Sequence, residues 1–266
     1  MTRYTIPIYQ VDAFSSQPFK GNPAAVCMMK EDLPDHTLQC IAAENNLAET
    51  AYIWHHDHDF HIRWFTPTIE VDLCGHATLA AAFILFYTHT VKGDRIKFNS
   101  RSGPLYVTRE SDGRLVLDFP VDQYISVDCP AYVETAIHCQ ILDFIKGKSD
   151  YLARVVSENA LKSIIPDFSL IKQLPSRGLI VTAPGDTVDF VSRCFFPQSG
   201  IDEDPVTGSA HTTLTPYWAL LLGRNTLTAK QVSLRGGDLY CSLQGDRVFI
   251  GGYASLFLEG QIFVYA

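Results

Sequence analysis

The feature that most constrains the fold is a pair of similar motifs separated by half of the chain. The first motif runs from Leu73 to Leu79 (LCGHATL), the second from Val206 to Thr212 (VTGSAHT), and each leads into an apolar, helix-like stretch. Gly75 and Gly208, inside the two motifs, are 133 residues apart in a chain of 266 residues. One duplication explains this spacing, because solenoid repeats recur every ~20 to 50 residues. The chain is therefore expected to consist of two similar halves that face one site.

The two motifs also indicate a kind of ligand. Glycine lets the backbone turn sharply and approach a bound molecule closely. The free N–H groups and the dipole at a helix start favour an anion. Two such ends are expected to hold one small carboxylate. Acidic residues near the motifs, together with His76, are candidates for proton transfer on that ligand; these acids are Glu49, Asp72, Asp202 and Asp204.

Some of these acids have a simpler explanation. Asp72, Asp202 and Glu203 each lie just before a predicted helix start. Acidic side chains are favoured there in any protein, because they cap the helix or interact with its dipole. These three residues are therefore excluded from the predicted catalytic set.

Composition excludes several classes of function. The chain has 29 acidic and 21 basic residues and a net charge of −8, which argues against nucleic acid or an anionic membrane as partner. The N-terminus lacks the apolar region of a signal peptide, and the apolar stretch at 79–87 is too short to span a bilayer. Seven cysteines without CxxC spacing indicate reduced thiols. We expect a cytoplasmic protein that acts on a small molecule, without a nucleic-acid or membrane partner.

Local patterns predict alternating strands and helices in two lobes, 1–119 and 120–266, with the option that the final strand packs back on the first lobe. Pro120 marks the boundary between the lobes. The first lobe opens with a predicted hairpin around Gly21-Asn22-Pro23. Further predicted elements are a helix at 35–46, strands at 49–54 and 60–65, a helix from Gly75, a helix at 132–145, a helix at 210–222 and a strand at 231–237.

Several motifs in order resemble the phenazine-biosynthesis PhzF-like isomerase family, within the diaminopimelate-epimerase and proline-racemase fold group. The resemblance covers nearly the whole chain. It implies an α+β fold with two similar lobes, each a β-barrel-like sheet around a central helix, and an active site in the cleft between them. It also implies a homodimer and a reaction without a cofactor, and no metal site is expected. The motifs are VDAF from Val11, GNPA from Gly21, LAETA from Leu47, FTP from Phe65, LCGHAT from Leu73, RCFFP from Arg193, DPVTGSA from Asp204 and RGG from Arg235.

In this family pattern the general base is Glu49. A carboxylate in an apolar strand can have its pKa raised towards neutrality by desolvation, which suits proton abstraction from carbon. The resemblance further implies that His76 and Asp204 bind or polarise the substrate and that Ser209 forms a hydrogen bond with it. The N–H groups near Gly75 and Gly208 are expected to bind a carboxylate or to stabilise an enolate-like charge. The implied reaction moves a proton from one carbon of a small carboxylate to another.

Two alternatives remain open at this point. An amino-acid epimerase or racemase of the same fold needs one thiol at each helix start, and Cys74 matches the first position. The second position carries Thr207 or Ser209, and an alcohol is a poor base for a carbon acid. The place of Cys74 at a helix start nevertheless favours a reactive thiol. The other alternative is a non-catalytic protein that binds a small carboxylate.

A histidine-rich segment from His55 to His61 (HHDHDFH) suggests a metal site. It lies at the turn between two predicted strands, where alternate side chains point to opposite faces. Four ligands from this segment alone are therefore awkward to arrange around one ion. We expect a solvated hairpin tip here.

Overall fold

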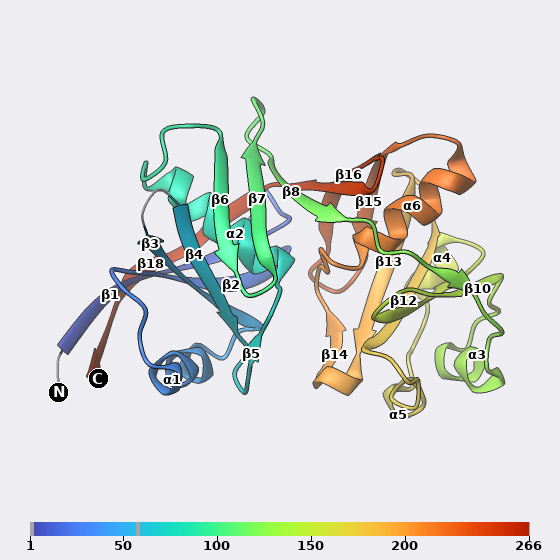
Figure 1. Ribbon diagram of the computed structural model, residues 1–266. Helices are drawn as coiled ribbons and strands as arrows, with labels where there is room; N and C mark the ends of the chain where they lie inside the picture. The colour runs from blue at the N-terminus through green and yellow to red at the C-terminus, as the bar shows by residue number, and fades with distance from the viewer. Residues whose placement is uncertain (1–2, 57–58, 266) are drawn as a thin grey trace. The chain divides into compact units, whose positions relative to one another are not determined.

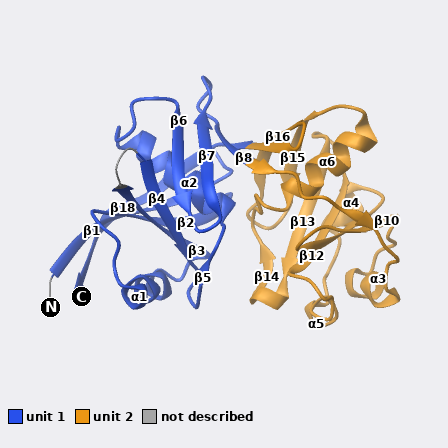
Figure 2. Cartoon of the chain, in the orientation of Figure 1, with its two compact units in different colours: residues 1–118, 251–266 blue, residues 119–250 orange. Residues whose placement is uncertain are grey.

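The computed structural model describes residues 3–56 and 59–265, in two compact units (Figures 1 and 2). Unit 1 comprises Met1–Asp118 and Gly251–Ala266, and unit 2 comprises Phe119–Ile250. The chain thus leaves unit 1 once and returns to it at the end. Residues 251–266 are grouped with the first lobe and not with the rest of 120–266. Asp57 and His58 of the histidine-rich segment lie outside the described residues.

Unit 1 contains a mixed sheet in which strands follow the order β18, β1, β2, β3, β4, β6, β7 and β8. The β2–β3 and β4–β6 pairs are parallel, and the other pairs are antiparallel. The short strand β5 adds to β4. The bounds are β1 Arg3–Ala13, β2 Asn22–Met29, β3 Glu49–His56, β4 Asp59–Phe65, β5 Glu70–Val71, β6 Arg95–Ser100, β7 Gly103–Arg109, β8 Leu115–Pro120 and β18 Ala254–Tyr265.

The central helix of unit 1 is α2 (Gly75–Tyr87), which packs against β1, β2 and β3. Eleven of its 13 residues are buried, as expected for a helix that is apolar on all sides. A second helix, α1 (Asp35–Asn45), packs on β3 and β4. The buried Tyr52 hydroxyl of β3 donates to the Leu38 carbonyl of α1 at 2.6 Å and ties this helix to the sheet.

The strands of unit 2 pair in the order β9, β10, β11, β12, β13, β15 and β16. The β11–β12 and β13–β15 pairs are parallel, and β14 also pairs with β13. The bounds are β9 Ile125–Ser126, β10 Asp143–Lys146, β11 Asp150–Arg154, β12 Gly178–Pro184, β13 Phe190–Phe196, a 3₁₀ turn Pro197–Ser199, β14 Ile201–Asp204, β15 Thr226–Gln231, β16 Gly237–Gln244 and β17 Arg247–Gly252.

Helices pack on unit 2's sheet through both sets of alternating side chains. Leu179 and Val181 of β12 belong to a core cluster with residues of α3 (Ala131–Ile137), α4 (Glu158–Lys162) and α5 (Phe168–Ile171). Thr182, which alternates with them, accepts a hydrogen bond at 3.0 Å from Trp218 of α6 (His211–Leu222). The period of two along the strand thus directs one set of side chains to α6 and the other to the small helices.

Two predicted elements of the second half are wrong. The helix expected at 132–145 ends at Ile137, because His138 takes a left-handed conformation (φ 48°) that closes α3, and the chain continues as β10. The strand expected at 231–237 is a loop between β15 and β16, in which Gly236 is also left-handed (φ 68°).

The turn between β1 and β2 provides a test of backbone constraint. Gly21 has φ +66°, and a Cβ there would lie 2.1 Å from the Ala13 carbonyl oxygen. Gly103 has φ +95° with open space around it. We expect Gly103→Ala to lower the free energy of unfolding by about 1 kcal/mol through backbone strain alone. Gly21→Ala should lower it by more than about 2 kcal/mol, since the clash adds to the strain. Urea unfolding of both variants measures this, and equal losses would contradict it.

The buried His211 predicts how stability depends on pH. Burial lowers the pKa of His211 to about 4 from 6.5. Between these values the unfolded histidine binds a proton that the folded one does not. The free energy of unfolding therefore falls as the pH drops through this window, by about 1.4 kcal/mol per pH unit.

His211→Asn removes this titration and keeps an N–H donor for the Thr207 carbonyl, which lies 2.9 Å from His211 Nδ1. Between pH 6 and pH 4.5 we expect the free energy of unfolding to fall less steeply in this variant than in the wild type. The two slopes should differ by about 1.4 kcal/mol per pH unit. Urea unfolding across this range is the measurement. His36→Asn, at an exposed position of α1, is the matched control. An unchanged slope in His211→Asn would contradict the assignment.

Candidate active site

Glu49 lies at the junction between α1 and β3. After α1 ends at Asn45, Asn46 turns the chain in a left-handed conformation (φ 50°), and β3 then begins at Glu49. β3 runs parallel to β2, with Ala24 beside Glu49. The Glu49 side chain is 14% exposed. Its carboxylate therefore stands at the first position of an interior strand and is largely removed from water.

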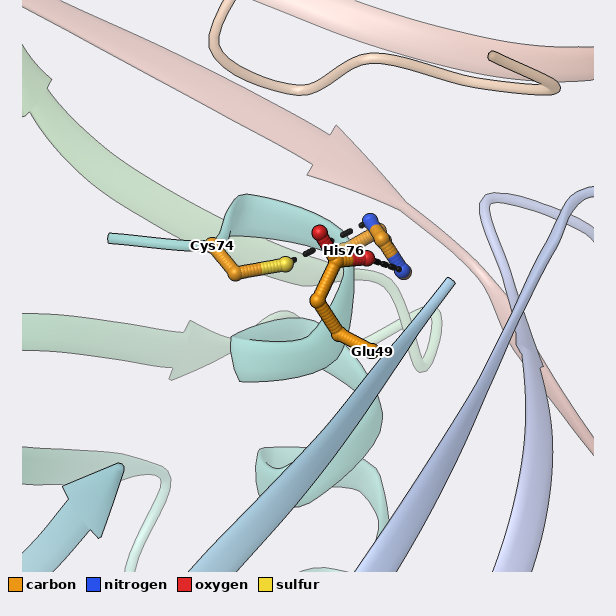
Figure 3. A group of neighbouring side chains, drawn as sticks. All are labelled: Glu49, Cys74 and His76. Atoms are coloured by element: carbon orange, nitrogen blue, oxygen red, sulfur yellow. Dashed lines mark hydrogen bonds and ion pairs between the residues drawn. The ribbon is translucent and has the colours of Figure 1, made fainter. Parts of the chain in front are cut away.

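His76 and Cys74 come from the start of α2 (Figure 3). Cys74 is the residue before the helix, in an extended conformation, and His76 is the second helical residue. The Nε2 atom of His76 lies 3.2 Å from Glu49 Oε2, and its Nδ1 atom lies 3.5 Å from Cys74 Sγ. The imidazole thus contacts the carboxylate through one nitrogen and the thiol through the other.

Asn22 adds a contact that the sequence interpretation missed. It is the first residue of β2, fully buried, and its Nδ2 atom lies 3.3 Å from His76 Nδ1. From the sequence, Asn22 is assigned to a turn and to the GNPA motif, without a role in the site. A polar amide followed directly by an apolar strand was the available signal, because such a side chain needs a buried polar partner.

Burial determines the charge state of His76. Desolvation lowers the pKa of His76 to about 3, so its ring is neutral at neutral pH. The contact between His76 and Glu49 is close enough for an ion pair, but the neutral ring makes it a contact between a carboxylate and an uncharged imidazole. A neutral imidazole carries one proton and donates from one nitrogen while it accepts at the other.

Glu49, Cys74 and His76 are also metal-ligand types, and one ligand atom from each lies within 4.8 Å of the others. Zinc would need a single histidine nitrogen together with the thiolate and the carboxylate around one point. Here the thiol contacts Nδ1 and the carboxylate contacts Nε2, on different sides of the ring. This arrangement fits a chain of hydrogen-bonding groups better than a chelate.

In unit 2, Asp204 is held by a buried polar cluster. It ends β14 beside Cys194 of β13, and its carboxylate accepts a short hydrogen bond from the Thr207 hydroxyl. The fully buried Gln231 donates to the Asp204 carbonyl at 2.6 Å and accepts from the Thr207 N–H at 2.9 Å. Gln231 was missed because it was assigned to a strand without a role.

Ser209 lies in the turn before α6 and contacts an ion pair. Both terminal nitrogens of Arg177 donate to Ser209 Oγ at 3.2 Å. The same guanidinium binds both carboxylate oxygens of Asp150, one of them from Nε at 2.9 Å. Burial alone would lower the pKa of Arg177, but the hydrogen bonds that it donates to Asp150 and the negative charge of that carboxylate outweigh burial and raise the pKa. Neither Arg177 nor Asp150 belongs to a motif that the sequence interpretation used.

The remaining candidates have ordinary surroundings. Asp72 and Asp202 are exposed, and Glu203 forms an ion pair with Arg193 at 2.8 Å. At the histidine-rich segment, β3 and β4 form a hairpin in which the His61 ring stacks on Trp54, with 5.3 Å between the ring centroids. Of the predicted site residues, the structure brings Glu49, Gly75 and His76 together in unit 1, while Asp204, Gly208 and Ser209 lie in unit 2.

No helix in the described part of the chain is long and apolar enough to cross a membrane.

Residues 11–260 match the family model described as phenazine biosynthesis-like protein. An uncharacterized isomerase of Pseudomonas aeruginosa is 50% identical over 257 residues, which cover 97% of this chain and 98% of that protein. The crystal structure of a PhzF-family protein of Enterococcus faecalis superposes with a TM-score of 0.95 at 46% identity, over 98% of this chain and 100% of that one.

The fold extends to more distant proteins. A Pseudomonas aeruginosa protein described as a predicted epimerase has a TM-score of 0.74 at 18% identity, covering 97% of this chain and 99% of that one, which shows a shared fold alone. The expected α+β architecture, two epimerase-like lobes each with a sheet and a central helix, is confirmed. The match over nearly the whole length shows that this chain belongs to the PhzF family of phenazine biosynthesis-like proteins and is an isomerase.

Proposed function

We propose that this isomerase moves a proton on a small carboxylate substrate without a cofactor, with Glu49 as the general base. The observation that carries the proposal is the contact of 3.2 Å between the largely buried Glu49 carboxylate and the neutral His76 ring. A carboxylate so placed can take a proton from carbon. A neutral imidazole beside it can donate a hydrogen bond without delivering a full positive charge.

The start of α2 supplies the complementary electrostatics. The first N–H groups of a helix have no partner within the helix, and the dipole favours negative charge there. Proton removal breaks a C–H bond and leaves its electron pair in the conjugated system of the substrate, as an enolate-like anion. The N–H groups near Gly75 would stabilise that anion. Glu49 then returns the proton to a second carbon, so that the double bond migrates.

Asp204, Gly208 and Ser209 are proposed to contribute from unit 2. In this proposal Asp204 binds or polarises the substrate, Ser209 forms a hydrogen bond with it and Gly208 offers a backbone N–H. Support comes from the rigid placement of Asp204 and Ser209, through Gln231 and Arg177 respectively. Homodimer formation, a cytoplasmic location and a biosynthetic role remain predictions.

The thiol-dependent epimerase is the second candidate, favoured by the place of Cys74 beside His76. This mechanism needs a second thiol that acts as a base, and Cys194 does not meet that need. Cys194 neighbours Asp204 in the sheet but is fully buried, and burial raises its thiol pKa well above the ordinary value. Such a thiol stays protonated and is a poor base. A protein that only binds a carboxylate is the third candidate.

Replacement of Glu49 tests the proposed base. We expect the wild-type protein to move the double bond of a dihydro-hydroxyanthranilate or a related unsaturated carboxylate, followed by proton NMR in deuterium oxide. Glu49→Gln should lower this rate by ~10²-fold or more, because the amide cannot accept the proton. Glu44→Gln, at an exposed position of α1, is the matched control. Full activity in Glu49→Gln would contradict the proposal, and ligand binding without turnover by the wild type would favour the binding protein.

Replacement of Cys74 separates the two enzyme mechanisms. Serine preserves a hydrogen-bond donor next to His76 Nδ1 but is a poor base. We expect Cys74→Ser to retain activity within a few-fold of the wild type if Glu49 is the base. A thiol mechanism predicts a loss of ~10²-fold or more together with loss of α-proton exchange on amino carboxylates. The same NMR assay measures both effects.

A further inference from the structure

The orientation of the His76 ring depends on a residue outside the proposed catalytic set. Asn22 follows the tight turn at Gly21 and begins β2, where it pairs with Ala13 of β1. Its side chain is fully buried, and Nδ2 lies 3.3 Å from His76 Nδ1. The hairpin backbone therefore holds one amide against one particular nitrogen of the ring.

This contact determines which nitrogen carries the proton. An amide nitrogen only donates hydrogen bonds, so Nδ1 must present its lone pair to Asn22. The thiol of Cys74, 3.5 Å from the same nitrogen, is able to donate to Nδ1 as well. Because the ring is neutral, its single proton then resides on Nε2.

The opposite side of the ring leads to the same assignment. Nε2 faces Glu49 Oε2 at 3.2 Å and has no hydrogen-bond partner within residues 3–56 and 59–265. At this distance a protonated Nε2 is within reach of the carboxylate as a hydrogen-bond donor. The other tautomer would direct an Nε2 lone pair at the carboxylate oxygen and place Nδ1–H against the amide N–H, which is repulsive at both ends.

We propose that Asn22 is a positioning residue that holds His76 in the Nε2–H tautomer and so presents an N–H donor to Glu49. The tautomer follows from the geometry of unit 1, whereas its effect on catalysis rests on the proposed function of Glu49. Asn22 acts through His76 and has no contact with substrate in this proposal.

The first measurement reads the tautomer without any substrate. In protein labelled with ¹⁵N-histidine, two-bond ¹⁵N–¹H spectra distinguish protonated from unprotonated ring nitrogens, and His76 is assigned as the signal missing from His76→Gln. We expect an unprotonated Nδ1 and a protonated Nε2 in the wild-type protein. A protonated Nδ1 in the wild-type protein overturns the proposal.

The second measurement reverses the donor at position 22. Asn22→Asp keeps the shape of the side chain but replaces the amide donor with a carboxylate that only accepts. We expect Nδ1 of His76 to become protonated in this variant, whether the ring is neutral or charged. Asn99→Asp adds the same charge on β6 of unit 1 and should leave the His76 signals unchanged. Unaltered His76 signals in Asn22→Asp overturn the proposal; if that variant does not fold, the wild-type spectrum still decides the assignment.

The third measurement separates positioning from a structural role. With dihydro-hydroxyanthranilate as the probe, Asn22→Asp should lower kcat by roughly 10²-fold with KM little changed, and Asn22→Ala should lower kcat less. A merely structural role predicts the reverse order, because alanine leaves the larger cavity. That reverse order, or full kcat with a changed tautomer, overturns the positioning role. If the wild-type protein and Glu49→Gln are equally inactive, the proposed function fails, while the spectra still decide the role of Asn22.

Discussion

The candidate site in unit 1 depends on the burial of the first turn of α2. A helix with this composition has no polar face, and its residues from Gly75 to Ala82 are all buried. Its leading N–H groups therefore act in surroundings of low dielectric constant, where interactions with charge are stronger than in water. The sheet around α2 supplies the partners: β3 contributes Glu49 and β2 contributes Asn22.

Burial of the helix start also determines the chemistry of the side chain placed there. A histidine at the second helical position loses solvation, and the positive end of the helix dipole further disfavours a charged ring. His76 is therefore a neutral hydrogen-bonding group whose single proton must be placed by its neighbours. A cation next to a carboxylate reduces its basicity strongly, whereas a neutral donor does so less. The neutral His76 ring therefore lowers the basicity of Glu49 less than a charged imidazolium would.

The sequence predicted the architecture well because the strongest signals were local and periodic. The Gly75 motif, the hairpin around Gly21 and the strand beginning at Glu49 all lie where the patterns placed them. The error at 132–145 arose because the left-handed His138 ends α3, and a histidine has no sequence signature for that conformation. The error at 231–237 arose in the loop after β15, where the left-handed Gly236 stands just before β16. Asn22 and Arg177 were missed for another reason: their importance comes from partners distant in sequence, His76 and Ser209, which only the tertiary structure brings near.

The two units place different side chains after the glycines of similar motifs. In unit 1 the residue after the motif glycine is His76, neutral and positioned by Asn22. In unit 2 the corresponding residue is Ser209, whose oxygen accepts from the charged Arg177–Asp150 pair. Because Arg177 uses the lone pairs of that hydroxyl, its hydrogen is free to point elsewhere, and Ser209 becomes a donor suited to an anion. In the proposed function a proton acceptor in surroundings without full positive charge and a donor anchored by an ion pair have complementary roles, and different side chains at a few positions of two similar lobes are sufficient to produce both.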